Sequence, residues 1–225
     1  MCGILGYIST TGQGPDLDRL ERLALVTETR GRHAWGMAWL DSDGLQVFKT
    51  AKPAHAALWS LECVSQAQIM IGHCRWATHG DPSDNRNNHP HPCGTGWMIH
   101  NGVVTNYRDL LHAEHLTPSS QCDSEVLGIL MARGGGSLGQ RLTRTLALAE
   151  GGHAILALWD KPARLLIARR GRPLHFGAAP EGLYFASLPE GLPEPRSLPD
   201  GYAAILQREA GGKAKRIWEE QFIPF

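Results

Sequence analysis

Residues 153–170 read HAILALWDKPARLLIARR, and this stretch indicates how the chain folds. Two apolar runs, 153–160 and 164–170, flank a short polar segment, which is typical of two strands joined by a tight turn. Because a short turn reverses the chain, such strands pair antiparallel. Three more candidate strands follow with short connections, at 174–177, 183–187 and 202–207, so we expect antiparallel pairing among all five.

The remaining elements occur in blocks. Further candidate strands lie at 3–9, 35–40, 45–49, 69–76 and 97–100. Apolar residues at helical spacing predict helices over 16–29, 106–116, 123–133 and 137–150. Helices that do not alternate with strands are typical of an α+β fold. We therefore expect a single domain, residues 1–225, with a sheet-on-sheet core and helices outside.

Composition excludes several classes of function. The 22 basic and 22 acidic residues give a formal net charge of zero. Broad binding to nucleic acid or to a membrane surface relies on excess positive charge, so neither is expected here. The sequence has no apolar run of about 18 residues, so we expect no membrane span. Its start, MCGILGYIST, does not resemble a signal peptide. The five cysteines form no C-x-x-C pair, which favours a reducing, cytoplasmic location.

A thiol at position 2 lies next to the initiator methionine. Removal of Met1, which a small second residue favours, would leave Cys2 at the amino terminus. One residue would then carry both a nucleophile and a base, because a free α-amine titrates near ~7.7–8.0 and can accept the thiol proton. The alternative is that Cys2 is only a small buried residue at the start of the first strand.

A polar loop follows the strand that ends near Arg75. Residues 72–80 read GHCRWATHG, and residues 81–92 contain almost no apolar side chain. A loop of this length within a compact domain is more often functional than not. Arg75 at the strand end has the geometry to bind a carboxylate through two hydrogen bonds. The alternative is a surface arginine in a salt bridge.

Histidines gather in the same region. His73, His79, His89, His91 and Cys93 were considered as zinc ligands. Their spacing matches neither an H-E-x-x-H helix nor a standard zinc finger. We therefore expect no metal ion and no cofactor.

Two later segments carry polar groups suited to acyl transfer. Asn101 and Gly102 follow a strand, and the amide of Asn101 with the N–H of Gly102 would form a donor pair for a developing oxyanion. A tight turn is the alternative. Asp123 begins a helix, where it either caps free N–H groups or receives a ligand ammonium. Together with Cys2 and Arg75, these residues describe an acyl-transfer site with a clamp for an amino acid.

The same residues in this order resemble the class II glutamine amidotransferase domain of the N-terminal nucleophile (Ntn) hydrolases. The likeness is greatest to the glutaminase domain of glucosamine-6-phosphate synthase, and it covers nearly the whole chain. The matching stretches are Met1–Tyr7, Gly72–Gly80, Asp81–Ser83, His89–His91, His100–Gly102 with Asn106–Tyr107, Asp123–Glu125, Leu183–Ser187 and Leu198–Gly201.

This resemblance implies a four-layer α/β/β/α sandwich of two antiparallel sheets flanked by helices. It implies that Cys2, freed by removal of Met1, attacks the side-chain amide of L-glutamine, and that Asn101 and Gly102 hold the oxyanion. A γ-glutamyl thioester would then be hydrolysed to glutamate, with release of ammonia. The resemblance also assigns the remaining pocket residues: Arg75 to the substrate carboxylate, Asp123 to its ammonium, Thr78 and His79 to the pocket wall, and Trp76 to a gate for ammonia.

The chain departs from the family pattern at two points. Where the family usually has Arg-Gly-x-Asp, residues 30–33 read RGRH, so His33 replaces an aspartate. The sequence also stops near the end of the glutaminase domain, so we expect a separate synthase protein to accept the ammonia. The alternatives are an amidohydrolase of the same fold that acts on another γ-glutamyl compound, and an inactive glutamine-binding regulatory module.

Overall fold

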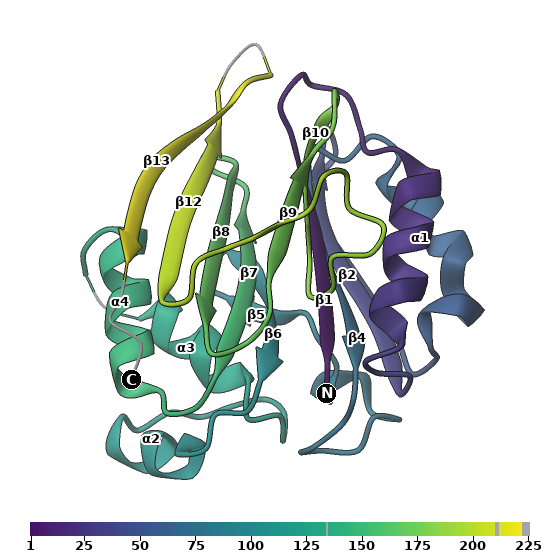
Figure 1. The fold of residues 1–225 in the computed structure, drawn as a ribbon. Helices are drawn as coiled ribbons and strands as arrows, with labels where there is room; N and C mark the ends of the chain where they lie inside the picture. The colour runs from purple at the N-terminus through teal and green to yellow at the C-terminus, as the bar shows by residue number, and fades with distance from the viewer. Residues whose placement is uncertain (134, 210–211, 222–225) are drawn as a thin grey trace.

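The computed structural model describes residues 1–133, 135–209 and 212–221. Within them, two antiparallel sheets lie face to face (Figure 1). The seven-stranded sheet has the order β11 (Arg196–Ser197), β9 (His175–Ala178), β10 (Gly182–Ala186), β1 (Gly3–Ser9), β4 (Ile69–Arg75), β2 (Ala34–Asp41) and β3 (Gly44–Thr50). The six-stranded sheet has the order β13 (Ala214–Gln221), β12 (Tyr202–Arg208), β8 (Arg164–Arg170), β7 (His153–Trp159), β6 (Gly96–Gly102) and β5 (His91–Cys93).

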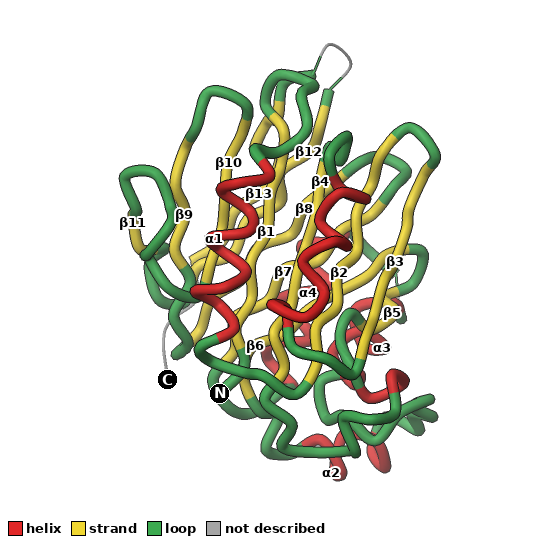
Figure 2. The backbone as a smooth tube through the Cα atoms, turned by 90° about the vertical axis from the view of Figure 1, so that its right-hand side faces the viewer, coloured by secondary structure: helices red, strands yellow, loops and turns green. Residues whose placement is uncertain are grey.

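Helices cover the outer faces of both sheets. The seven-stranded sheet is covered by α1 (Leu17–Glu28) and by the 3₁₀ segment η1 (Ala54–Val64), and Figure 2 shows α1 lying along that face. The six-stranded sheet is covered by α2 (Tyr107–Ala113), α3 (Glu125–Ala132) and α4 (Leu138–Leu148). A short 3₁₀ turn, η2 (Asn85–Asn87), lies in the polar loop. The expected four-layer α/β/β/α sandwich is therefore confirmed.

The central strand β1 is buried on both faces, and its residues alternate between two cores. Ile4 and Ile8 pack between the sheets, whereas Leu5 and Tyr7 pack beneath the outer helices. This alternation follows from the two-residue period of a strand. At Gly6 a side chain is excluded, because a Cβ there would lie 2.8 Å from the Leu156 side chain of the opposite sheet.

The four helices predicted from apolar spacing are present, each two to four residues shorter than expected. Asp16 and Ser137 explain where two of them begin. The Asp16 carboxylate accepts the Arg19 N–H, and Ser137 forms a capping box with Gln140. Five elements were not anticipated from the sequence: the 3₁₀ segments η1 and η2 and the strands β5, β11 and β13.

One expectation about strand pairing was wrong in part. Antiparallel pairing holds between β7 and β8 and between β9 and β10. However, β8 and β9 lie in different sheets, and β12 pairs with β8 instead of with β10. The chain crosses between the sheets at Gly171, whose positive φ of 66° suits a glycine. A short connection can therefore join strands of different sheets as well as strands of the same sheet.

No helix in the described part of the chain is long and apolar enough to cross a membrane.

We expect Leu156→Ala to lower the free energy of unfolding by about 2–5 kcal/mol. Leu156 is fully buried between the sheets and contacts Gly6, so truncation leaves a cavity at the sheet interface. Urea denaturation measures the change. The matched control is Leu25→Ala on the exposed side of α1, which should cost far less. Equal losses in the two variants would contradict this account of the core.

Candidate active site

Three strand ends from the two sheets converge at one edge of the sandwich. Cys2 precedes β1, and Arg75 ends the neighbouring strand β4, with Gly3 and Cys74 as the last paired residues. Asn101 and Gly102 end β6 of the opposite sheet, which packs against β1 and β4. The inter-sheet packing therefore brings together residues separated by about 100 positions along the chain.

The Cys2 side chain is held by backbone groups of Trp76. The Trp76 N–H lies 3.3 Å from the Cys2 sulfur, and the thiol lies 3.4 Å from the Trp76 carbonyl oxygen. Arg30 donates to the Cys2 carbonyl at 2.8 Å. Burial raises the pKa of the Cys2 thiol, and the Trp76 N–H and nearby positive charges offset this only partly. The thiol therefore needs a base to become a nucleophile.

A cavity of about 190 Å³ opens beside this thiol. Five of the eight residues predicted for the site line it: Cys2, Trp76, Thr78, Asn101 and Gly102. Met1, Val103 and Arg172 complete the wall. The Trp76 side chain is 49% exposed, so it stands between the cavity and solvent.

Asn101 presents a free donor at this cavity. Its side chain is 1% exposed, and its Nδ2 has no hydrogen-bond partner in the described part of the chain. Buried donors are nearly always paired, so this one is available to a ligand. Gly102 cannot carry a side chain, since a Cβ there would lie 2.2 Å from the Gly152 carbonyl oxygen. The Gly102 backbone therefore packs directly against Gly152 and His100.

Arg75 is buried and fixed by the polar loop. Its Nη1 donates to Asn88 Oδ1 at 2.7 Å, and its Nη2 donates to the carbonyl oxygens of His79 and Gly80. Asn88 in turn donates to the Pro82 carbonyl at 2.8 Å. The loop thus orients a guanidinium that is 2% exposed. Sequence reasoning missed Asn88, because an asparagine in a polar loop carries no distinguishing pattern.

Asp123 lies beside His79 on the other side of this loop. Its Oδ2 accepts the Val104 N–H at 2.7 Å, and its Oδ1 lies 3.5 Å from His79 Nδ1. Burial raises the pKa of the Asp123 carboxyl, while the Val104 N–H and His79 oppose this rise. Arg75, His79 and Asp123 therefore lie next to one another, but they do not line the Cys2 cavity; Asp123 lines a separate cavity of about 190 Å³ together with Tyr107 and Cys122.

His33 shows what replaces the expected aspartate. Its Nδ1 accepts the Ala77 N–H at 2.9 Å, and its ring stacks on Trp76 with centroids 4.7 Å apart. The backbone N–H of His33 donates to the Arg75 carbonyl oxygen. His33 therefore supports the loop that carries Arg75 to Thr78.

Two neutral histidines underlie Asn101. His100 Nδ1 lies 2.8 Å from Ser124 Oγ, and His100 Nε2 lies 3.0 Å from His153 Nδ1. Burial lowers the pKa of His153 to about 4 and that of His100 well below its ordinary value. This pair links the end of β6 to β7 and to the start of α3.

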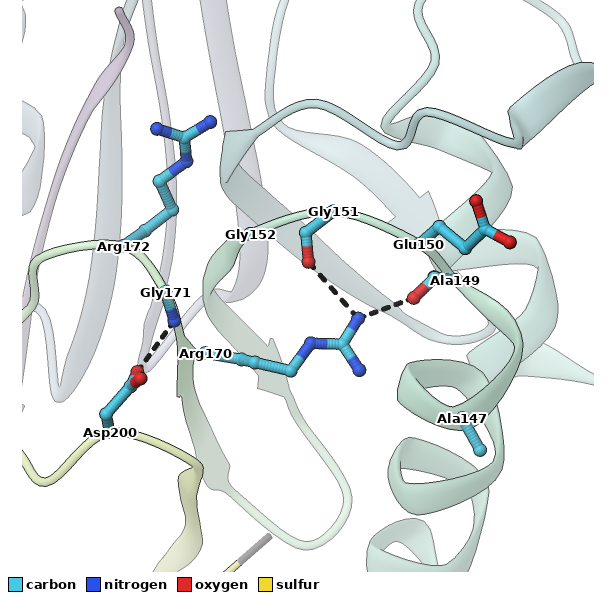
Figure 3. Close-up of a pocket in the computed structure, with 9 residues that line it drawn as sticks. All are labelled: Ala147, Ala149, Glu150, Gly151, Gly152, Arg170, Gly171, Arg172 and Asp200. Atoms are coloured by element: carbon cyan, nitrogen blue, oxygen red, sulfur yellow. Dashed lines mark hydrogen bonds between the residues drawn. The ribbon is translucent and has the colours of Figure 1, made fainter. Parts of the chain in front are cut away.

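A second and larger cavity, of about 610 Å³, adjoins the first (Figure 3). Its wall includes Gly151, Gly152, Arg170 and Arg172, and Arg172 lines both cavities. Figure 3 shows the Arg170 guanidinium reaching the carbonyls of Ala149 and Gly151, whereas Arg172 points away from it. The Arg170 side chain thus caps the C-terminal end of α4, and Arg172 is left between the two cavities.

Comparison with known proteins identifies the family. The model of the glutamine amidotransferase domain matches residues 73–194, which is more than half of the chain. The chain belongs to this family. The amidotransferase domain is 38% identical over 192 residues to the glutamine–fructose-6-phosphate aminotransferase (isomerizing) of Leifsonia xyli, covering 79% of this chain and 30% of that protein. The chain spans about a third of the length of such relatives.

Solved structures confirm the Ntn-hydrolase fold of the amidotransferase domain. The glutamine phosphoribosylpyrophosphate amidotransferase of B. subtilis superposes with a TM-score of 0.77 at 21% identity, covering 99% of this chain and 49% of that one. A glutamine aminotransferase class-II domain protein from Silicibacter pomeroyi superposes with a TM-score of 0.60 at 20% identity, covering 99% and 100% of the two chains. At these identities the likeness concerns the fold alone.

We expect the amidotransferase domain to lose stability as the pH falls from about 6.5 toward 4. His100 and His153 have lowered pKa values in the folded chain, so the unfolded chain binds more protons in this window. Each histidine contributes a slope of up to ~1.4 kcal/mol per pH unit. Urea denaturation at several pH values measures the slope.

A matched pair of variants tests the assignment of this slope. His153→Gln should flatten the slope, whereas His112→Gln on the exposed side of α2 should not. A slope that His153→Gln leaves unchanged would show that other groups cause the acid sensitivity.

Proposed function

We propose that the protein hydrolyses the side-chain amide of L-glutamine to glutamate and ammonia, through a thioester on Cys2. The observation that carries this proposal is the shared cavity of the Cys2 thiol and the unpartnered Asn101 Nδ2. A nucleophile next to a free, preorganised donor is the arrangement that acyl transfer requires.

The reaction begins once Met1 has been removed. The freed α-amine of Cys2 accepts the thiol proton, directly or through water, and the thiolate attacks the amide carbon. Asn101 Nδ2 and the Gly102 N–H stabilise the oxyanion, and a donor of this kind typically contributes ~10²–10³ in rate. The α-amine then returns the proton to the departing ammonia, and water hydrolyses the thioester to glutamate.

The amino-acid end of the substrate is held by opposite charges. Arg75 binds the α-carboxylate, because the polar loop leaves its remaining N–H groups free for a second acceptor. Asp123 binds the α-ammonium through Oδ1, since Oδ2 already accepts the Val104 N–H. Thr78 and His79 form the wall between them, and Trp76 gates the release of ammonia.

Ammonia released by this chain is passed to a synthase, either a separate protein or a further domain. The relatives that support this are aminotransferases about three times as long as the matched segment. Residues 1–225 act as a single domain in the cytoplasm, and the chemistry requires no cofactor.

One observation favours a second substrate class, another γ-glutamyl compound. Arg172 lines the cavity of Cys2, its Nε is buried without a partner in the described residues, and its Nη1 contacts only the Met1 sulfur, at 3.4 Å. Once Met1 is removed, this guanidinium is free to bind an anionic group on the leaving amine. The adjoining 610 Å³ cavity has room for such a group.

Glutamate release by the Met1-processed protein tests both substrates. Release from L-glutamine should be abolished in Cys2→Ala, with the state of the amino terminus checked by intact mass. A γ-glutamyl amino acid assayed in parallel reports the second class, and Arg172→Met should affect only that substrate. Full activity in protein that retains Met1 would overturn the mechanism, and turnover of neither substrate would favour a glutamine-binding regulatory module.

We expect Asn88→Ala to raise KM for L-glutamine by about tenfold or more, with little change in kcat. Asn88 Oδ1 orients Arg75 by accepting its Nη1–H, and Asn88 does not line the Cys2 cavity. Loss of a hydrogen bond to a charged group costs about 1.5–3 kcal/mol. Steady-state kinetics measure the change. Asn88→Asp keeps the acceptor for Arg75 but loses the donor to the Pro82 carbonyl, so it should recover only part of the affinity. A fall confined to kcat would contradict the assigned role.

A further inference from the structure

Two histidines and a cysteine meet in the interior behind the substrate clamp. His89 follows Asn88, His91 begins β5, and Cys122 precedes Asp123. Their exposed fractions are 2%, 1% and 7%. One nitrogen from each histidine and the Cys122 sulfur lie within 4.8 Å of one another. Two segments of the chain thus bring three potential metal ligands to one buried point.

The histidine nitrogens of this cluster lack partners. Within the described part of the chain, neither ring nitrogen of His89 is hydrogen-bonded, nor is Nε2 of His91. Buried polar atoms are nearly always paired, with protein, water or an ion. Burial lowers the pKa of His91 to about 3 and that of His89 well below its ordinary value. Both rings are therefore neutral at neutral pH, with a lone pair available to a metal.

The charges around the cluster indicate the kind of ion. Lys49 and Arg75 face it together with the carboxylates of Asp123 and Glu125, so the surrounding charges cancel. A Cys122 thiolate would neutralise one positive charge, whereas a divalent ion would leave a net charge buried at high cost. Three donors are one fewer than a closed, structural zinc site uses, although catalytic zinc sites also have three. Thiolate and imidazole ligands suit soft ions such as Cu⁺.

We propose that His89, His91 and Cys122 form a binding site for a soft monovalent metal ion, for which Cu⁺ is the probe. On binding, the S–H bond of Cys122 breaks, the sulfur bonds to the ion, and the proton passes to bulk solvent without electron transfer. The Cys122 thiol lies 3.9 Å from Asp123 Oδ1, a contact that it gives up when the sulfur binds the ion. The donors must also move closer together, since ligands of one ion lie ~3.5 Å apart.

This inference revises the expectation of no metal, which rested on spacing along the chain. That spacing grouped the histidines with Cys93, yet Cys93 lies in the core beneath α3, where its carbonyl accepts the Trp159 indole N–H. Cys122, about 30 residues away in sequence, takes its place. The proposed site does not depend on the proposed catalytic function.

Anaerobic titration with Cu⁺ against a Cu⁺-specific chelator tests the site. The full chain carries Cys2→Ala and Cys63→Ser, which remove the two thiols that are not buried. We expect one Cu⁺ and one released proton per chain, a near-ultraviolet band from thiolate-to-copper charge transfer, and a higher unfolding temperature. Zn²⁺ titrated in parallel should bind at least ~100-fold more weakly.

Matched variants assign the ligands. Cys122→Ala and His91→Gln should each abolish the band and the proton release, whereas Cys93→Ala, which removes another buried thiol, should retain both. If Cys122→Ala fails to fold, Cys122→Ser replaces it. The proposal is overturned if no Cu⁺ is retained, if binding survives the loss of Cys122, or if Zn²⁺ binds as tightly as Cu⁺.

Discussion

Cys2 and Asn101 belong to different sheets, and only the packing between the sheets brings the thiol to the side-chain amide. Ile4, Gly6 and Ile8 on β1 face the opposite sheet, and Leu156 fills the space that Gly6 leaves. A side chain at Gly6 would displace the Leu156 side chain that fills this space between the sheets. The geometry of the cavity is therefore set by apolar contacts along the strands that lead to it.

Much of this arrangement could be predicted from the sequence, because it depends on local patterns. The helix over 16–29 was found from apolar spacing, and the strands at 3–9 and 164–170 match β1 and β8 in both bounds. The sequence could not show that the chain changes sheets after β8, since a short connection looks the same in both cases. Pairing partners are decided by which apolar faces remain uncovered, and this depends on the whole chain.

Some residues of the candidate site could likewise be recognised from the sequence, and others could not. Residues with distinctive chemistry, such as Cys2 and Arg75, were recognisable at once. Their supporting contacts were not: Asn88 accepts a hydrogen bond from Arg75, and His33, recognised only as a departure from the family pattern, accepts the Ala77 N–H. Such contacts join segments far apart in sequence, and polar residues that make them look like any others in a loop. Cys122 was overlooked as a partner of His89 and His91 for the same reason.

The position of β1 within its sheet has a consequence for how the chain is made. β1 lies between β4 and β10, and its register pairs Leu5 with Gly72 on one side and with Ala186 on the other. β1 therefore waits for a strand about 180 residues further along the chain before both its edges are covered. Contacts this distant slow folding and leave strand edges exposed during synthesis. The segment that carries the nucleophile thus completes its pairing only after residues up to about 186 have been made.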